Sequence, residues 1–234
     1  MNKIIVVSGG TKGIGKSIIK HFAAQQFDII TCARNVEDLN QLQKEVQVQF
    51  PNVALHYIQA DLSIKEDVEN FVSYIKDHDK LIHILVNNAG IFFPGQLHTE
   101  EDGALEKMIQ TNLYSAYYLT RGLIELLKEQ KGHIFNICST ASITPYINGG
   151  SYCISKFALL GFSKVLREEM KEFGVRVTSI LPGATFTASW EGADIPEERF
   201  MKSEDVAIVI FATYTLSENA VVEEILLRPQ LGDI

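Results

Sequence analysis

The sequence has few of the residues that mark secreted or disulfide-bonded chains. It contains three cysteines, Cys32, Cys138 and Cys153, without the spacing of a CxxC motif or a zinc site. An odd number of cysteines favours reduced thiols, so we expect a cytoplasmic protein. The apolar run at residues 4–7 is short and is soon followed by glycines, so we expect no secretion signal.

Sequence features of membrane, nucleic-acid and metal-binding proteins are also missing. No apolar stretch reaches the roughly 18 to 20 residues of a membrane-spanning helix. The formal net charge is −8, and acidic and basic residues are interspersed without a polybasic cluster. The six histidines are scattered and form no HExxH pattern. We therefore predict no membrane contact, no nucleic-acid partner and no bound metal.

Apolar residues make up 46% of the chain and fall into β-rich runs that alternate with helical segments. Continuous apolar strands that alternate with helices are typical of a parallel sheet covered on both faces. We expect one domain over residues 1–234, an α/β Rossmann-type doubly wound three-layer fold with a mainly parallel seven-stranded sheet. The expected strands are 4–7, 28–33, 53–59, 82–86, 133–137, 175–181 and 224–227. The expected helices are 13–26, 36–49, 64–76, 105–129, 152–173 and 203–216.

A glycine-rich turn, Ser8-Gly9-Gly10-Thr11-Lys12-Gly13-Ile14-Gly15, joins the first expected strand to the first helix. Glycines there permit a tight turn and let the backbone approach a pyrophosphate, whose charge the helix N-terminus favours. The spacing is GxxxGxG rather than the GxGxxG of many dinucleotide sites. The turn nevertheless predicts a dinucleotide cofactor because of its place between strand and helix.

The end of the second expected strand bears on the choice of cofactor. It carries Arg34 and no acidic residue, and an arginine there suits a 2′-phosphate. Lys12, in the glycine turn, adds a second positive charge that can reach the same group. We therefore predict NADP(H) in preference to NAD(H).

Tyr152 and Lys156 lie four residues apart in an expected helix, so both side chains project from one face. A phenol with a pKa of about 10 is a poor acid or base near neutral pH. An adjacent ammonium favours the phenolate and lowers that pKa. The pair therefore predicts an acid/base group suited to carbonyl–alcohol chemistry.

Further short motifs follow the glycine turn in a fixed order along nearly the whole chain. They are Asp61-Leu62, Asn87-Asn88-Ala89-Gly90, Asn112, Ser139, Tyr152-x-x-x-Lys156 and Pro182-Gly183-x-x-x-Thr187. In this order and spacing the chain resembles the classical short-chain dehydrogenase/reductase family. It departs from the common family pattern at residues 223–234, which lack the usual Gly-Gly pair. We expect a homodimer or homotetramer, with a dimer through helices 105–129 and 152–173 less affected by that departure.

The resemblance implies a role for each matched residue. Tyr152 would exchange a proton with the substrate oxygen, and Lys156 would lower the tyrosine pKa and hydrogen-bond the nicotinamide ribose. Ser139 would hold the substrate oxygen and stabilise its developing charge, and Asn112 would hold a water or a backbone kink in a proton relay. The cofactor-binding set would be Ser8, Gly9, Thr11, Lys12, Gly13, Ile14, Gly15, Arg34, Asp61, Leu62, Asn88, Ala89, Gly90, Tyr152, Lys156, Pro182, Gly183 and Thr187.

We therefore predict an NADP(H)-dependent oxidoreductase that interconverts a carbonyl and a secondary alcohol of a small molecule. Two alternatives stay open: a non-catalytic cofactor-binding sensor or interaction protein, and a sugar-nucleotide epimerase or dehydratase, although those resemble longer chains. The substrate is not predicted. Aromatic and proline residues in loops could line its pocket, and the irregular segment 188–202 could act as a lid. These loop residues are Phe92, Phe93, Pro94, Tyr146 and Trp190.

Overall fold

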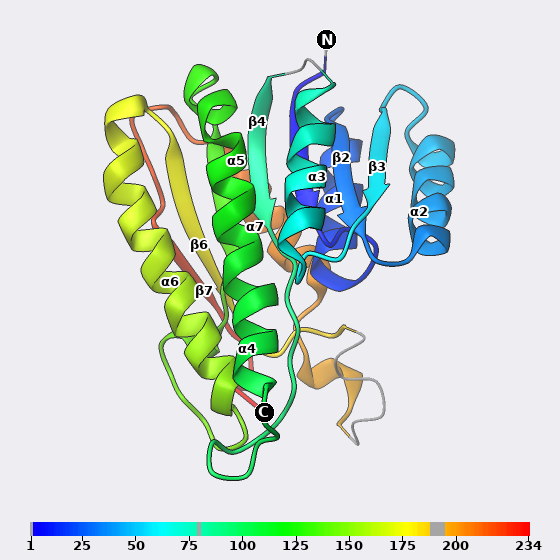
Figure 1. Cartoon of the computed structure of the whole chain (residues 1–234). Coiled ribbons are helices and arrows are strands. Elements are labelled where there is room, and N and C mark those ends of the chain that lie inside the picture. The colour runs from blue at the N-terminus through cyan, green and yellow to red at the C-terminus, as the bar shows by residue number, and fades with distance from the viewer. Residues whose placement is uncertain (1, 79–80, 188–194) are drawn as a thin grey trace.

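The computed structural model describes residues 2–78, 81–187 and 195–234 of the chain (Figure 1). Its strands form one sheet in the order β3-β2-β1-β4-β5-β6-β7, and every neighbouring pair is parallel. The strands are β1 (Ile4–Ser8), β2 (Asp28–Ala33), β3 (Leu55–Gln59), β4 (Ile82–Asn87), β5 (His133–Ile137), β6 (Arg176–Pro182) and β7 (Glu224–Leu227). This confirms the doubly wound α/β fold and replaces "mainly parallel" with wholly parallel for the described sheet.

Helices cover both faces of the sheet (Figure 1). The α-helices are α1 (Gly13–Ala24), α2 (Val36–Gln49), α3 (Lys65–Lys76), α4 (Ala104–Ile109), α5 (Ser115–Glu129), α6 (Gly150–Met170) and α7 (Ser203–Tyr214). Short turns of other helix types are η1 (Gln110–Tyr114), η2 (Thr140–Ser142), η3 (Lys171–Phe173) and η5 (Glu197–Arg199).

Alternation along the central strand β1 divides the interior into two cores. Ile4 and Val6 pack in a cluster with residues of α3, α5 and α6, and Ile5 and Val7 pack in a second cluster with residues of α1 and α7. Successive strand residues point to opposite faces, so a strand apolar at every position must be covered on both. The all-apolar run at the start of the chain is therefore the sequence signature of this central strand.

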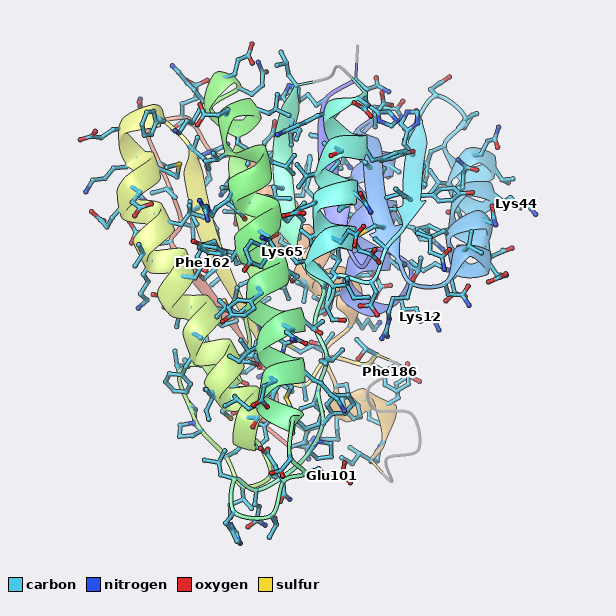
Figure 2. All side chains as sticks on the ribbon, viewed as in Figure 1. Lys12, Lys44, Lys65, Glu101, Phe162 and Phe186 are labelled. Carbon is cyan, nitrogen blue, oxygen red and sulfur yellow. The ribbon has the colours of Figure 1, made fainter. Side chains whose placement is uncertain are left out.

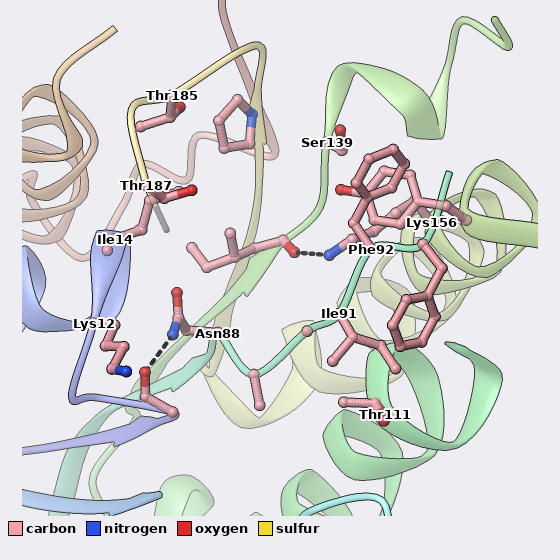
Figure 3. Close-up of a pocket in the computed structure, with 18 of the residues that line it drawn as sticks. Lys12, Ile14, Asn88, Ile91, Phe92, Thr111, Ser139, Lys156, Thr185 and Thr187 are labelled. Carbon is pink, nitrogen blue, oxygen red and sulfur yellow. Dashed lines mark hydrogen bonds between the residues drawn. The ribbon is translucent and has the colours of Figure 1, made fainter. Parts of the chain in front are cut away.

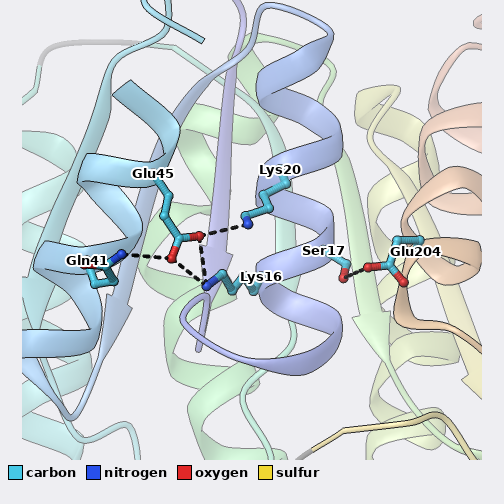
Figure 4. Close-up of polar contacts among 6 residues, drawn as sticks. All are labelled: Lys16, Ser17, Lys20, Gln41, Glu45 and Glu204. Carbon is cyan, nitrogen blue, oxygen red and sulfur yellow. Dashed lines mark hydrogen bonds and ion pairs between the residues drawn. The ribbon is translucent and has the colours of Figure 1, made fainter. Parts of the chain in front are cut away.

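Polar contacts fix α1 between its neighbours on one face of the sheet (Figure 4). The Glu45 carboxylate of α2 pairs with Lys16 at 3.0 Å and with Lys20 at 2.8 Å. Those two lysines lower the pKa of Glu45 to about 2. On the other side Ser17 donates to Glu204 of α7. Because α1 carries the glycine turn at its start, these contacts also hold the turn in place.

The expected helix 105–129 differs from the structure in one informative way. It is broken by the π-helical segment η1, where the backbone bonds span one residue more than in an α-helix. The expected helix 152–173 begins earlier, at Gly150, and ends in a short 3-10 turn before Gly174, whose φ of 71° is left-handed. Of the expected lid, residues 188–194, Trp190 among them, lie outside the described residues. None of the described helices is long and apolar enough to span a bilayer.

Strand order places the functional end of the molecule. The chain moves from β1 to β3 on one side of the sheet and from β4 to β7 on the other. Between β1 and β4 the connections diverge, and in such sheets ligands bind beyond the carboxyl ends of the strands.

Candidate functional site

A cleft of about 1200 Å³ lies at the carboxyl ends of the strands (Figure 3). It brings together most residues that the sequence marked as candidates. Those lining it are Gly9, Thr11, Lys12, Gly13, Ile14, Arg34, Asp61, Leu62, Asn88, Ala89, Gly90, Ser139, Tyr152, Lys156, Pro182, Gly183 and Thr187. Ser8, Gly15 and Asn112 do not line the cleft, but each lies next to residues that do.

The glycine turn leaves room that a side chain would fill. Gly9 and Gly13 have φ values of 67° and 50°, which glycine adopts without strain. A Cβ on Gly15 would overlap the carbonyl oxygen of Gly9 and lie 2.5 Å from the Asn88 amide nitrogen. Among the described residues, no side chain caps the start of α1, so its first amides remain for an anion. This cradle fits the pyrophosphate of a dinucleotide.

Ser8 and Asn88 fasten the turn to the end of β4. The Ser8 hydroxyl oxygen accepts from the backbone N–H groups of Asn88 at 2.9 Å and Ala89 at 3.0 Å. In return the Asn88 side-chain amide donates to the carbonyl oxygen of Ser8 at 2.9 Å and to that of Gly9 at 3.0 Å. Figure 3 shows the second of these bonds. Ser8 is only 2% exposed. The structure thus places Ser8 as a support of the cradle, where the sequence suggested direct cofactor contact.

The two cations predicted at the adenosine end both line the cleft. Arg34 is exposed and has no ion pair with any residue that the structure describes. Lys12, at the lower end of the sheet in Figure 2, pairs with the Asp38 carboxylate at 3.3 Å. Asp38 belongs to the first turn of α2, whose cap Asn35 accepts from the Asp38 N–H at 2.8 Å. Sequence analysis missed Asp38 because it considered only the strand end and not the helix after it.

Asp61 and Leu62 follow β3 and form a second wall at the same end. The Asp61 carboxylate accepts from the backbone N–H of Ser63 at 3.0 Å and from its hydroxyl at 2.8 Å. The Asp61 N–H donates to Asp67 at 2.7 Å. These bonds fix the turn, which leaves Leu62 as an apolar surface of the cleft.

Lys156 is buried at the far end of the cleft and is turned toward the backbone. Its ammonium donates to the carbonyl oxygen of Ile137 at 2.9 Å (Figure 3) and lies 5.8 Å from the Tyr152 ring centroid. Burial lowers the pKa of Lys156 to about 8. A Cβ on Gly90 would lie 3.5 Å from this nitrogen, an ordinary van der Waals distance, so the chain at Gly90 runs alongside the lysine.

The pKa of Tyr152 differs from the sequence expectation. Burial raises the pKa of Tyr152 to about 12, and the neighbouring Ser139 hydroxyl acts in the lowering direction. The expected depression of the tyrosine pKa by Lys156 is therefore wrong for this structure, because the desolvation of the phenol dominates. The Tyr152 ring also packs edge-on against Phe92, with 4.9 Å between centroids.

Asn112 lies in η1 and clamps the backbone just beyond Gly90. Its oxygen accepts from the Ile91 N–H at 2.7 Å, and its amide donates to the Ile91 carbonyl at 3.0 Å and to the Ser155 hydroxyl at 2.9 Å. Both amide protons are thus used by protein partners. Of the two roles expected for Asn112, the geometry favours the one that acts on the backbone.

Ser139 lies two residues after β5 and caps the short helix η2. Its oxygen accepts from the Ala141 N–H at 3.1 Å, while its own N–H donates to the Ser142 hydroxyl at 3.2 Å. A hydroxyl that accepts from the backbone keeps its proton for another partner. Ser139 can therefore donate to an oxygen atom in the cleft.

The tail of the chain also reaches the cleft, which the sequence analysis did not predict. Asp233 and Ile234 line it near Gly183. A turn brings them back, with the Gly232 N–H bonded to the Pro229 carbonyl at 2.9 Å and Asp233 paired with Arg228. The Pro-x-x-Gly spacing was a signal for that turn.

Of the loop residues suggested for a substrate pocket, Phe92, Phe93, Pro94 and Tyr146 line the cleft.

Comparisons with known proteins agree with this site. Residues 3–197 match the family model for short chain dehydrogenases. A sepiapterin reductase of Chlorobaculum tepidum is 34% identical over 245 residues, covering 100% of this chain and 99% of that protein. A metagenomic short-chain oxidoreductase solved with NADP is 28% identical, with a TM-score of 0.84 and 97% of each chain covered. Serine dehydrogenase in a closed form with NADP+ is 30% identical, with a TM-score of 0.85 and 95% of this chain and 93% of that chain covered. With its motifs gathered in one cleft, the chain belongs to the short-chain dehydrogenase/reductase family of oxidoreductases, which act on small molecules.

Proposed function

We propose that this protein is an NADP(H)-dependent oxidoreductase that interconverts a carbonyl and a secondary alcohol, with Tyr152 as the acid/base. The observation that carries the proposal is the single cleft that joins the glycine cradle to Ser139, Tyr152 and Lys156. A bound nicotinamide would supply or accept the hydride. The chain supplies orientation, a proton and a place for the charge that develops on oxygen.

The residues at the catalytic end divide this work. The raised pKa of Tyr152 keeps the phenol protonated near neutral pH, and the Ser139 hydroxyl, which acts to lower that pKa, favours transfer of this proton to a carbonyl oxygen. The Ser139 hydroxyl, which hydrogen-bonds Tyr152 in this structure, can give that oxygen a second donor. The Lys156 ammonium would favour the phenolate that is left after proton transfer, and it can turn from the Ile137 carbonyl to ribose hydroxyls.

The preference for NADP(H) is supported by charge at the adenosine end. Arg34 lines the cleft and has no ion pair with a described residue, and Lys12 lines the same cleft and pairs with the half-buried carboxylate of Asp38. A 2′-phosphate would add two negative charges against these cations. Two similar solved structures contain NADP, which agrees with this choice.

A homodimer or homotetramer remains part of the proposal. Large apolar side chains are exposed along η1, α5 and α6, the helices expected to pair. They are Tyr114, Tyr117, Ile154, Phe157 and Val165. A mass measurement in solution by light scattering tests this directly, and a monomer would remove it.

The experiment that tests the function follows NADPH absorbance with the purified protein. The panel contains ketones, ketoacyl thioesters, quinones, sugars and sepiapterin, each assayed with NADPH, and serine, an alcohol, which is assayed with NADP+; sepiapterin and serine are included because relatives carry those names. Turnover of a carbonyl substrate with NADPH supports the proposal. Tight NADPH binding without turnover on any compound favours the sensor, and turnover of a sugar nucleotide without net change in NADPH favours the epimerase.

A further inference from the structure

The helix that carries Tyr152 and Lys156 has no cap of its own. α6 begins after Gly149, and none of its described flanking side chains caps it. Its first turn contains no acidic residue. Because the first amides of a helix have no partner within it, the start of α6 needs an acceptor from elsewhere.

That acceptor is Glu100, from the loop between β4 and α4. One carboxylate oxygen accepts from the Ser151 N–H at 2.9 Å, and the other accepts from the Ser151 hydroxyl. Ser151 is 1% exposed and immediately precedes Tyr152. A carboxylate at a helix N-terminus is stabilised both by the helix dipole and by charge-assisted hydrogen bonds.

Two glycines make space for this carboxylate. A Cβ on Gly150 would overlap a Glu100 oxygen, and a Cβ on Gly95 would lie 2.6 Å from the Glu100 Cγ. Gly150 also has a φ of 22°, which other residues rarely adopt. The local backbone is therefore shaped around the Glu100 side chain.

The rest of the loop is joined to the same helix start. The Gly95 N–H donates to the Asn148 carbonyl at 3.0 Å, and the Gln96 amide donates to the Asn148 side chain at 3.1 Å. Phe92, at the beginning of the loop, packs on the Tyr152 ring. The loop thus contacts the catalytic tyrosine at one end and caps its helix at the other.

We propose that Glu100 is a positioning residue for the reaction, and this inference rests on the proposed function. Its carboxylate fixes the first turn of α6 and so sets where the Tyr152 hydroxyl stands relative to Ser139. A misplacement of about 1 Å in such a constellation can cost about 100-fold in rate. Glu100 contacts neither the glycine cradle nor Arg34, so cofactor affinity should not depend on it.

The test compares Glu100→Ala with a matched control, Glu101→Ala, whose side chain is exposed in the same loop (Figure 2). We expect kcat to fall by about 100-fold in Glu100→Ala, with the KM for NADPH unchanged and Glu101→Ala like wild type. Glu100→Gln keeps an acceptor for the Ser151 N–H and should recover about 10-fold of the loss. Ser151→Ala should lower kcat by less, and combining it with Glu100→Ala should add nothing.

Amide hydrogen exchange gives a reading that needs no substrate. Exchange over the first turn of α6 should rise in Glu100→Ala and stay unchanged in Glu101→Ala. The proposal is overturned if Glu100→Ala keeps wild-type kcat, or if it weakens NADPH binding and thermal stability as much as turnover. If the wild-type protein reduces no substrate, the proposed function and the positioning role of Glu100 are refuted together. The hydrogen-exchange result then shows whether Glu100 still stabilises the first turn of α6.

Discussion

The two ends of the cleft are built in different ways. At the cofactor end the chain presents a turn of successive backbone groups, which is held by hydrogen bonds of Ser8 and Asn88. At the catalytic end it presents side chains that arrive from separate loops and helices, such as Ser139, Tyr152 and the tail residue Asp233. Changes at the first end should act on cofactor affinity, and changes at the second should act on turnover.

The largest expected effect comes from a substitution at the catalytic end of the cleft, which should change turnover and leave cofactor affinity unchanged. Tyr152→Phe removes the proton donor, and general acid catalysis contributes about 100-fold to 10,000-fold in rate. We expect kcat to fall within that range while the NADPH dissociation constant, measured by fluorescence titration, stays close to wild type. Near wild-type turnover would refute the assignment of Tyr152.

The next effect probes the cradle. Gly15→Ala places a Cβ against the Gly9 carbonyl, so we expect the NADPH dissociation constant to rise by about 100-fold, the cost of about 2.7 kcal/mol. Gly161→Ala is its control, because a Cβ on that α6 glycine meets no described atom within 4 Å. This control should bind NADPH normally and gain up to about 1 kcal/mol in unfolding free energy. Equal NADPH binding by the two variants would show that the turn is not a cradle.

Within the cofactor end, charge should decide between the two nicotinamide cofactors. Arg34→Ala should raise the KM for NADPH by about 10-fold, since a charge-assisted hydrogen bond contributes about 1.5 to 3 kcal/mol. The KM for NADH should not change. Asp38→Asn should shift the preference the other way, because it frees Lys12 from its carboxylate. Equal changes with both cofactors would remove the argument for the 2′-phosphate.

The smallest effect is the pH dependence of reduction. Since burial lowers the pKa of Lys156 to about 8, its ammonium is lost as the pH rises through that value. Tyr152, with its pKa raised to about 12, keeps its proton over the same range. We expect kcat for reduction to fall above about pH 8 by up to about 10-fold per unit. A rate that is flat from about pH 7 to about pH 9 would show that the ammonium is not required.

The fold was open to prediction because its signals are local and repeated. Alternating apolar runs and the apolar residues at the start of β1 could be read directly, and all seven strands fell within two residues of their predicted limits at both ends. The π-helical break at Asn112 could not be read. It depends on the side chain clamping Ile91, which lies 21 residues away along the chain.

Residue order alone therefore determined the fold class, the glycine cradle and the candidates Ser139, Tyr152 and Lys156, because each depends on spacing within one element or on a recurring motif. Only the tertiary structure decided that Lys156 is bound to the Ile137 carbonyl, that burial raises the pKa of Tyr152, and that Glu100 caps α6. Those outcomes depend on desolvation and on contacts between loops distant along the chain. Spacing along a sequence carries no information on either quantity.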